Sequence, residues 1–261
     1  MEIEKFPTMR ITEQDSRRFE DKVVIESSLT IILNNREVVT LLCSPTKLDC
    51  LAIGFLSSEG LIKSKDEIKS IIIDDERGIV RVTTKEVGEP TPDISFRRLI
   101  GSSGGKVTNS SVVAGASRAE IKSRLQVSTS EVFALTEEFV QRSKVFKATG
   151  GVHSAALCNA KNILIFNEDI GRHNAIDKVF GECILKDLPM DDRIIITSGR
   201  VSSEILLKVA KRNIPILISK SAPTNLGVKL AADLGITLIG FVRGKRMNVY
   251  TSVWRVMPHG K

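Results

Sequence analysis

The segment EDIGRHNAID, from Glu168 to Asp177, gathers an unusual number of groups that can bind a ligand or exchange a proton. It follows NILIFN, an apolar run that predicts a buried strand, and precedes VFGECIL, which predicts an amphipathic helix. A corner between a strand and a helix needs a turn residue and a cap. The corner itself, EDIGRHN, carries two acids, an arginine and a histidine as well, and the surplus indicates a site.

Three further corners of the same kind follow apolar runs later in the chain: TSGRVSSE, SKSAPTN and FVRGKRMN. Ligands of open α/β sheets bind at the carboxyl ends of the strands, where helix amino termini also favour phosphate. Each corner taken singly could be a plain turn or cap, but all four carry charge or polarity beyond that need. Together they predict a crevice for an anionic, phosphorylated ligand, with positive charge from Arg172, Arg200, Arg243, Lys245 and Arg246.

The elements that must position these corners alternate from Ser128 onward in the order α-β-β-α-β-α-β-α-β. Apolar strands separated by helices predict an α/β fold with a mixed, mostly parallel sheet and helices on both faces. The first part of the chain reads as a smaller, β-rich α+β unit, with hairpins at Asn35-Arg36 and DERG and a helix from Ser44 to Gly60. A Gly-, Ser- and Pro-rich stretch follows it and predicts a linker or functional loop. We therefore expect two domains, residues 1–118, with the loop near 100–107, and residues 119–261.

Composition restricts the class of protein. The chain has 261 residues, 42% of them hydrophobic, and a formal net charge of +7. No apolar run approaches the roughly 20 residues that cross a bilayer, and the charged amino terminus is unlike a secretory signal, so we expect a cytoplasmic protein and no membrane partner. One Trp, one Tyr and dispersed basic residues argue against nucleic acid as the partner, and four Cys without a CxxC pair, with three His, argue against a metal site.

Two familiar chemistries do not fit. GSSGGKV, residues 101–107, lacks the first glycine and the hydroxyl residue of a phosphate-binding P-loop. The order of elements is also that of cytidine deaminases, whose zinc needs cysteines at two helix starts. Here those starts read GRHNAID and SGRVSSE and offer none.

Taken together, these corners resemble the FdhD family of sulfur-carrier proteins required for formate dehydrogenase activity. The matching segments, in order, are LAIGFLSSEGLI, TGGVHSAAL, EDIGRHNAIDKVFG, SGRVSSEILLK, SAPTNLGVKLA and GFVRGKRMNVYT. The resemblance implies a small amino-terminal domain, a larger domain of cytidine deaminase-like fold, and a homodimer. It implies transfer of persulfide sulfur from a cysteine desulfurase to the Mo-bis(molybdopterin guanine dinucleotide) cofactor of formate dehydrogenase. It further implies that the cofactor binds through its guanine nucleotide, at a segment matching Phe241 to Arg246.

We therefore expect cofactor contacts from the corners and from this segment. Asp169 or Asp177 would accept hydrogen bonds from guanine or from a ribose hydroxyl. The expected residues are Gly150, Gly151, His153, Asp169, Gly171, Arg172, His173, Asn174, Asp177, Ser198, Gly199, Arg200, Ser219, Ala222, Pro223, Thr224, Phe241, Val242, Arg243, Gly244, Lys245 and Arg246.

The chain departs from the family in one loop. The family's persulfide cysteine lies in a Cys-Gly-x-Cys-Gly type loop, where this chain reads SFRRLIGSSGGKV. Ser103, or Ser102, stands at that catalytic position, and a hydroxyl cannot carry sulfane sulfur. Either this member binds cofactor without transferring sulfur, or another thiol such as Cys43 serves, or the loop cysteines have been replaced in this sequence. A cofactor-binding chaperone, and a nucleotide-processing enzyme using His173 with Asp169 or Asp177, are the alternative functions.

Overall fold

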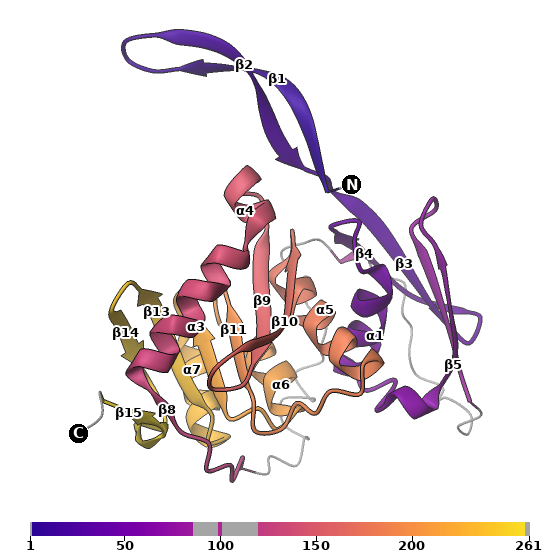
Figure 1. Ribbon diagram of the computed structural model, residues 1–261. Coiled ribbons are helices and arrows are strands. Elements are labelled where there is room, and N and C mark those ends of the chain that lie inside the picture. The colour runs from indigo at the N-terminus through magenta and orange to yellow at the C-terminus, as the bar shows by residue number, and fades with distance from the viewer. Residues whose placement is uncertain (1, 86–98, 101–119, 259–261) are drawn as a thin grey trace.

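The computed structural model describes residues 2–85, 99–100 and 120–258. Its first part holds a five-stranded sheet in the order β5-β6-β3-β4-β7, packed on one helix, and a separate two-stranded ribbon (Figure 1). The elements are β1 (Ile3–Ile11), β2 (Ser16–Val24), β3 (Ser27–Leu33), β4 (Arg36–Cys43), α1 (Leu48–Ser58), β5 (Ile68–Asp74), β6 (Ile79–Thr84) and β7 (Leu99–Ile100).

The second part is built on a six-stranded sheet in the order β10-β9-β11-β12-β13-β14, with a small parallel pair, β15-β8, beside it. The elements are β8 (Val127–Ser128), α3 (Thr129–Arg142), α4 (Lys144–Thr149), β9 (His153–Cys158), β10 (Ile163–Asp169), α5 (Arg172–Leu185), β11 (Ile194–Thr197), α6 (Ser203–Ala210), β12 (Ile216–Ser219), α7 (Asn225–Asp233), β13 (Thr237–Arg243), β14 (Arg246–Val249) and β15 (Val256–Met257).

The sheet is mixed, as expected, and β10, β11, β12 and β13 run in one direction, but most of the neighbouring strand pairs are antiparallel rather than parallel. Only β11 with β12 and β12 with β13 run parallel. β10 with β9, β9 with β11, and β13 with β14 are antiparallel. The reason is the length of the connections: short turns join β9 to β10 and β13 to β14, and a short turn permits only an antiparallel pair. The likeness to cytidine deaminases stays a prediction.

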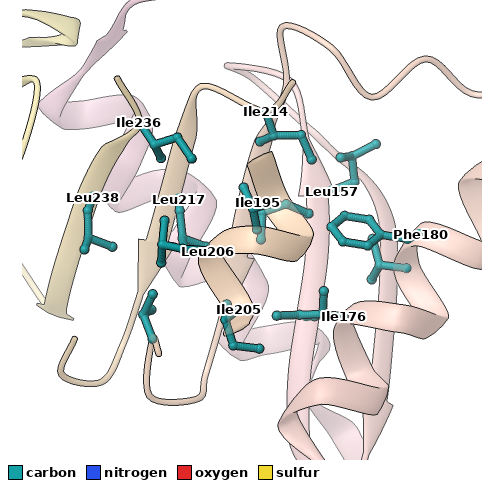
Figure 2. Packing of buried hydrophobic residues seen from close by; sticks show 14 of the residues in the cluster. Leu157, Ile176, Phe180, Ile195, Ile205, Leu206, Ile214, Leu217, Ile236 and Leu238 are labelled. Carbon is teal, nitrogen blue, oxygen red and sulfur yellow. The ribbon is translucent and has the colours of Figure 1, made fainter. Parts of the chain in front are cut away.

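Helices cover both faces of this sheet, as predicted, because successive strand residues point to opposite sides. On one face, Leu157, Ile195, Leu217 and Leu238 pack against α5, α6 and α7 (Figure 2). On the other face, neighbours of these residues, such as Ile194 and Ile196, pack against α3.

The first part of the chain joins the second through a close crossing of α1 and α5. Two glycines permit it: a Cβ at Gly54 would lie 1.8 Å from the carbonyl oxygen of Asp177, and one at Gly181 would lie 1.8 Å from that of Cys50. No side chain fits at either position. The proposed boundary between residues 118 and 119 falls outside the described residues.

Local predictions hold with small shifts. The first hairpin turns at Asn34 and Asn35, one residue earlier than predicted, and both have the positive φ that two-residue hairpin turns favour. The helix predicted from Ser44 begins at Leu48, and Gly60 follows its end with φ +81. Ser128 caps α3 in a reciprocal capping box with Glu131.

Within the described part of the chain, no helix has the length and apolar character to cross a membrane.

Candidate functional site

The polar corners meet at one edge of the six-stranded sheet. β10, β11, β12 and β13 end there, and β9, which runs the other way, begins there with His153 opposite Asp169. Backbone hydrogen bonds connect adjacent corners: Val201 N donates to Ala222 O at 3.1 Å, and Phe241 N donates to Ser221 O at 3.1 Å. Segments that are distant in the sequence therefore form one continuous surface.

Four cations lie on this edge and are here named the cationic rim: Arg172, Arg200, Lys220 and Arg243. Burial, and then the charge of Arg200, lower the pKa of Arg172. Burial, and then the charge of Arg243, lower the pKa of Lys220. None of the four forms an ion pair with a described carboxylate within 4.0 Å. Glu204 is the one carboxylate among the causes that act on Arg172, and it opposes the lowering of that pKa. Like charges held together with so little counter-charge favour an anionic ligand.

The absence of a side chain at Gly199 leaves room for Arg172 at the edge. Gly199 lies against Arg172, because a Cβ there would be 2.8 Å from the Cβ of the arginine.

Phe241 adopts φ 54, an outlier for a bulky residue, at the irregular register between β13 and β14. Such strain is concentrated at functional sites, so it marks this turn as part of the surface.

Two histidines with lowered pKa values lie at the edge. His153 Nδ1 lies 3.2 Å from Ser198 Oγ, and burial, then Arg172, lower the histidine's pKa. Burial, then Lys208 and Arg172, lower the pKa of His173 to about 3. Its Nε2 has no hydrogen-bond partner among the described residues, and Glu204 Oε2 lies 3.6 Å away. A histidine with this pKa is uncharged near pH 7, so it keeps one ring N–H but cannot act as an imidazolium acid.

Asp169 and Asn174, in contrast, are buried and fully engaged. Asp169 has no exposed surface and pairs with Lys178 Nζ at 2.7 Å. It also accepts hydrogen bonds from Ser44 N, Gly171 N and Asn174 Nδ2. Asn174 Nδ2 donates to the Leu42 carbonyl as well. Through these hydrogen bonds, Asp169 and Asn174 connect the site to the end of β4.

The other acids of the EDIGRHNAID segment are also occupied. Asp177 accepts a hydrogen bond from Ser58 Oγ at 2.7 Å and pairs with Lys208, so it connects α1, α5 and α6. Glu168 accepts from the backbone N–H groups of Val145 and Phe146, at the start of α4. The surplus of acids that made the segment conspicuous thus serves packing, and Arg172 and His173 remain for the site.

The remaining predicted residues divide in the same way. Val242 and Ser219 are buried, and Thr224 caps α7 through Gly227 N. Partly or fully exposed near the edge are Gly150, Gly151, Ser198, Ala222, Pro223, Gly244, Lys245 and Arg246. Gly171 and Gly199 are buried beneath them. The described residues contain no group of three or more His, Cys, Asp and Glu side chains that could hold a metal ion.

Comparison with known proteins identifies the family. The model of the FdhD/NarQ family matches residues 24–257. The chain belongs to the FdhD/NarQ family.

Curated relatives and a solved structure agree with this membership. "Sulfur carrier protein FdhD" of Bacillus pumilus is 43% identical over 90% of both chains, and that of Bacillus subtilis is 42% identical over 95% of both. A crystal structure from Desulfotalea psychrophila, described as "a putative formate dehydrogenase accessory protein", is 26% identical with a TM-score of 0.81. The match covers 98% of this chain and 100% of that one.

The cysteines of this FdhD/NarQ member are all buried. Burial, then the neighbouring Asp169, raise the pKa of Cys43 to about 12. Burial also raises the pKa of Cys50 and Cys183 to about 12, and raises that of Cys158 further. These four are the only cysteines in the sequence. None is an exposed thiolate, which is the form that attacks sulfur. Ser102 and Ser103 lie outside the described residues.

Sequence reasoning missed two members of this edge. Lys220 follows β12 in the corner SKSAPTN, where its charge could have been counted with the arginines. Glu204, in the first turn of α6, looked like an ordinary acidic residue at a helix start. Only its distance from His173 places it at the site.

Proposed function

We propose that this chain binds the guanine nucleotide end of Mo-bis(molybdopterin guanine dinucleotide) and serves the maturation of formate dehydrogenase. The cationic rim is the observation that carries the proposal, because its four cations lack described carboxylate partners and a diphosphate would supply the missing negative charge. The description of the Desulfotalea psychrophila structure as "a putative formate dehydrogenase accessory protein" supports the link to formate dehydrogenase.

The donor set of the edge fits this ligand. Arg172, Arg200, Lys220 and Arg243 would hold the diphosphate oxygens, and the backbone from Phe241 to Gly244 would lie against the nucleotide. When bound, the cofactor would supply the molybdenum redox chemistry that formate dehydrogenase uses. The part of this chain is to bind and orient the nucleotide.

The carboxylate that meets guanine needs a new assignment. Asp169 and Asp177 have internal partners and almost no exposed surface, so we assign them to the support of the site. Glu204 is partly exposed and lies beside His173 and Arg172. We propose Glu204 as the acceptor for the N–H donors of guanine.

We further propose that this member binds the cofactor without carrying sulfur on a cysteine of its own. The burial and raised pKa of every cysteine in the chain favour this second function over the sulfur transfer that the relatives' name implies. A nucleotide-processing reaction gains less support, since the low pKa of His173 makes it a poor proton donor near pH 7.

The proposed partners are formate dehydrogenase and a second copy of the chain, and the proposed location is the cytoplasm. A cysteine desulfurase, which the family resemblance implies, would meet only buried cysteines in this chain.

Calorimetric titration of the full chain with GDP, and with ADP for comparison, tests the proposal. We expect selective GDP binding that weakens about tenfold or more in Arg200→Ala and in Arg243→Ala, because a charge-assisted hydrogen bond contributes about 1.5–3 kcal/mol. Lys69→Ala, an exposed cation on β5, is the control for net charge and should leave affinity unchanged. Absence of binding to either nucleotide, or unchanged affinity in both arginine variants, would contradict the proposal.

A further inference from the structure

The four cations of the cationic rim fall into two pairs. Arg172 and Arg200 form the first pair. The side chain of Arg172 lies along Gly199, the residue before Arg200, since a Cβ at that glycine would be 2.8 Å from the Cβ of the arginine and 3.2 Å from its Cδ. The pKa of Arg172 agrees with this placement, because it is lowered by burial and then by the charge of Arg200.

Lys220 and Arg243 form the second pair. Phe241 N donates to Ser221 O at 3.1 Å, so the corner after β12 is bonded to the end of β13. Burial, and then the charge of Arg243, lower the pKa of Lys220. Each pair therefore offers two cations to one anionic group, and the rim as a whole has places for two such groups.

The corners that carry the two arginines of the first pair are built alike. Each runs from the last residue of a strand through a glycine to the arginine, as Asp169 to Arg172 after β10 and as Thr197 to Arg200 after β11. The side chain of the last strand residue accepts a hydrogen bond from the glycine N–H, at 2.9 Å in the first corner and at 3.1 Å in the second. A side chain that bonds the backbone two residues further on stabilises a turn.

Ser219, the last residue of β12, makes the same turn bond and one bond more. Its Oγ accepts from Ser221 N at 2.9 Å and donates to the carbonyl oxygen of Gly199 at 2.8 Å. Ser219 has no exposed surface, so it does not itself touch a ligand. Its hydroxyl instead connects the corner of the second pair with the corner that carries Arg200.

The two bonds of this hydroxyl act on the peptide groups next to two of the cations. The carbonyl of Gly199 belongs to the peptide group that joins it to Arg200, and the N–H of Ser221 belongs to the peptide group that joins it to Lys220. A planar peptide group turns as a unit. The hydroxyl therefore sets the direction in which Arg200 and Lys220 leave the backbone, and at Gly199 it restrains a residue whose lack of a Cβ allows many orientations.

Backbone hydrogen bonds hold the same two corners together on either side of this hydroxyl. Lys220 N donates to Thr197 O at 3.1 Å, and Val201 N donates to Ala222 O at 3.1 Å. The corners thus stay joined when the hydroxyl is removed. The particular contribution of Ser219 is the orientation of the cations and not the assembly of the edge.

We propose that Ser219 is a positioning residue that makes the rim selective for a diphosphate over a monophosphate. The first pair of cations holds one phosphate group and the second pair holds the other, and the Ser219 hydroxyl sets the position of one pair relative to the other. Neighbouring strands are about 4.8 Å apart, so pairs on the adjacent strands β11 and β12 suit two phosphates joined by one oxygen. The inference rests on the proposed function, which places the diphosphate of the ligand at the rim.

Calorimetric titration of the full chain with GDP and with GMP tests this selectivity. We expect the wild type to bind GDP about tenfold or more tightly than GMP, because the second phosphate meets its own pair of cations. Ser219→Ala should lose most of this preference through weaker binding of GDP, while its affinity for GMP stays unchanged. Ser219→Thr keeps the hydroxyl and should restore the preference.

Thr251→Val is the matched control for the loss of a buried hydroxyl. Thr251 Oγ1 donates to Ile236 O at 2.6 Å and accepts from Leu238 N at 3.0 Å, at the opposite edge of the same sheet. This variant loses the same kinds of hydrogen bond as Ser219→Ala, so both should unfold at lower urea concentration than the wild type. Thr251→Val should nevertheless keep the preference for GDP. A purely structural role of Ser219 would lower the affinities for GDP and GMP alike, and that result overturns the proposal.

Single variants of the exposed arginines test the division into pairs even where Ser219→Ala does not fold. Arg200→Ala and Arg243→Ala should each weaken the binding of GDP, but only one of them should weaken the binding of GMP, since a single phosphate needs a single pair. If both variants weaken GMP, or neither does, the division into two pairs is wrong.

Inorganic pyrophosphate and inorganic phosphate separate this inference from the proposed function, because they lack the guanine. A wild-type chain that prefers pyrophosphate over phosphate, but does not distinguish GDP from ADP, contradicts the guanine assignment and supports the selectivity of the rim. A chain that distinguishes GDP from ADP, but binds GMP as tightly as GDP, contradicts the selectivity alone. Absence of binding to all of these ligands contradicts both.

Discussion

The two sides of α5 carry polar groups for opposite purposes. Toward α1 and the end of β4, each acid has a cation: Asp169 pairs with Lys178 and Asp177 with Lys208. Toward the edge of the sheet, the cationic rim has no described carboxylate partner within 4.0 Å. A charge that the fold has neutralised holds elements together, whereas a charge left without a partner is available to a ligand. Residue type alone does not separate the two, because both sides draw on one ten-residue segment.

The largest effect should follow removal of a neutralised charge. Asp169→Ala leaves Lys178 buried without its partner, and breaking a buried pair in this way lowers the free energy of unfolding by about 3–5 kcal/mol. Urea unfolding measures the change. Asp169→Ala combined with Lys178→Met removes both charges and should recover part of the loss.

Arg200→Ala is the matched control from the other side of α5. Arg200 is exposed and has no described ion-pair partner, so its removal should change the free energy of unfolding by less than about 0.5 kcal/mol. Similar losses of unfolding free energy in Asp169→Ala and Arg200→Ala would show that the two sides of α5 do not differ in this way.

A smaller effect is expected at His173, which lies between the two sides. Its pKa is about 3 in the folded chain, and it is about 6.5 in an unfolded one. Below pH 6.5 the unfolded state therefore binds a proton that the folded state refuses. The contribution to stability is fully present above pH 6.5 and declines as the pH falls toward 3, by at most about 1.4 kcal/mol per pH unit.

Urea unfolding at a series of pH values measures this decline. His173→Gln cannot take up the proton, so its stability should fall less steeply than that of the wild type between pH 6.5 and pH 4. Equal slopes in the two proteins would mean that neither burial nor the cations around His173 lower its pKa.

The last prediction concerns Cys43, which we expect to take up no sulfur. This thiol lies beside Asp169 and Lys178 on the neutralised side of α5, with its pKa raised to about 12. After incubation with a cysteine desulfurase and free cysteine, the intact mass of the chain should therefore show no added sulfur. Ser103→Cys returns a thiol to the position that the family resemblance indicates, and this variant should gain sulfur. Sulfur bound to the wild-type chain would place a reactive thiol where we find only buried ones.

Much of the fold could be predicted from local patterns. The hairpin of β5 and β6 and the glycine after α1 depend on neighbours within a few residues, and both predictions are confirmed. Helices on both faces of the sheet followed from apolar strands and amphipathic helices. The direction of the strands did not, because the pairing of β9 with β11 joins segments separated by a hairpin and a helix. The ribbon of β1 and β2 could not be predicted in this way, because neither of its faces is buried and its sequence therefore shows no alternation of apolar and polar residues.

The same division holds for the candidate site. The sequence by itself determined that four polar corners follow four strands and that arginines are concentrated in them. Only the tertiary structure decided which of their charged groups face solvent. Asp169, Asn174 and Asp177 were predicted to meet the ligand, but α1 and the end of β4 fold over them and fill their hydrogen bonds. Glu204 was passed over, yet it lies near His173. The physical reason is that a polar side chain forms hydrogen bonds with the groups that the fold places within about 3 Å of it. For Asp169 and Asp177 these groups include Ser44 and Ser58, which lie more than a hundred positions away in the sequence.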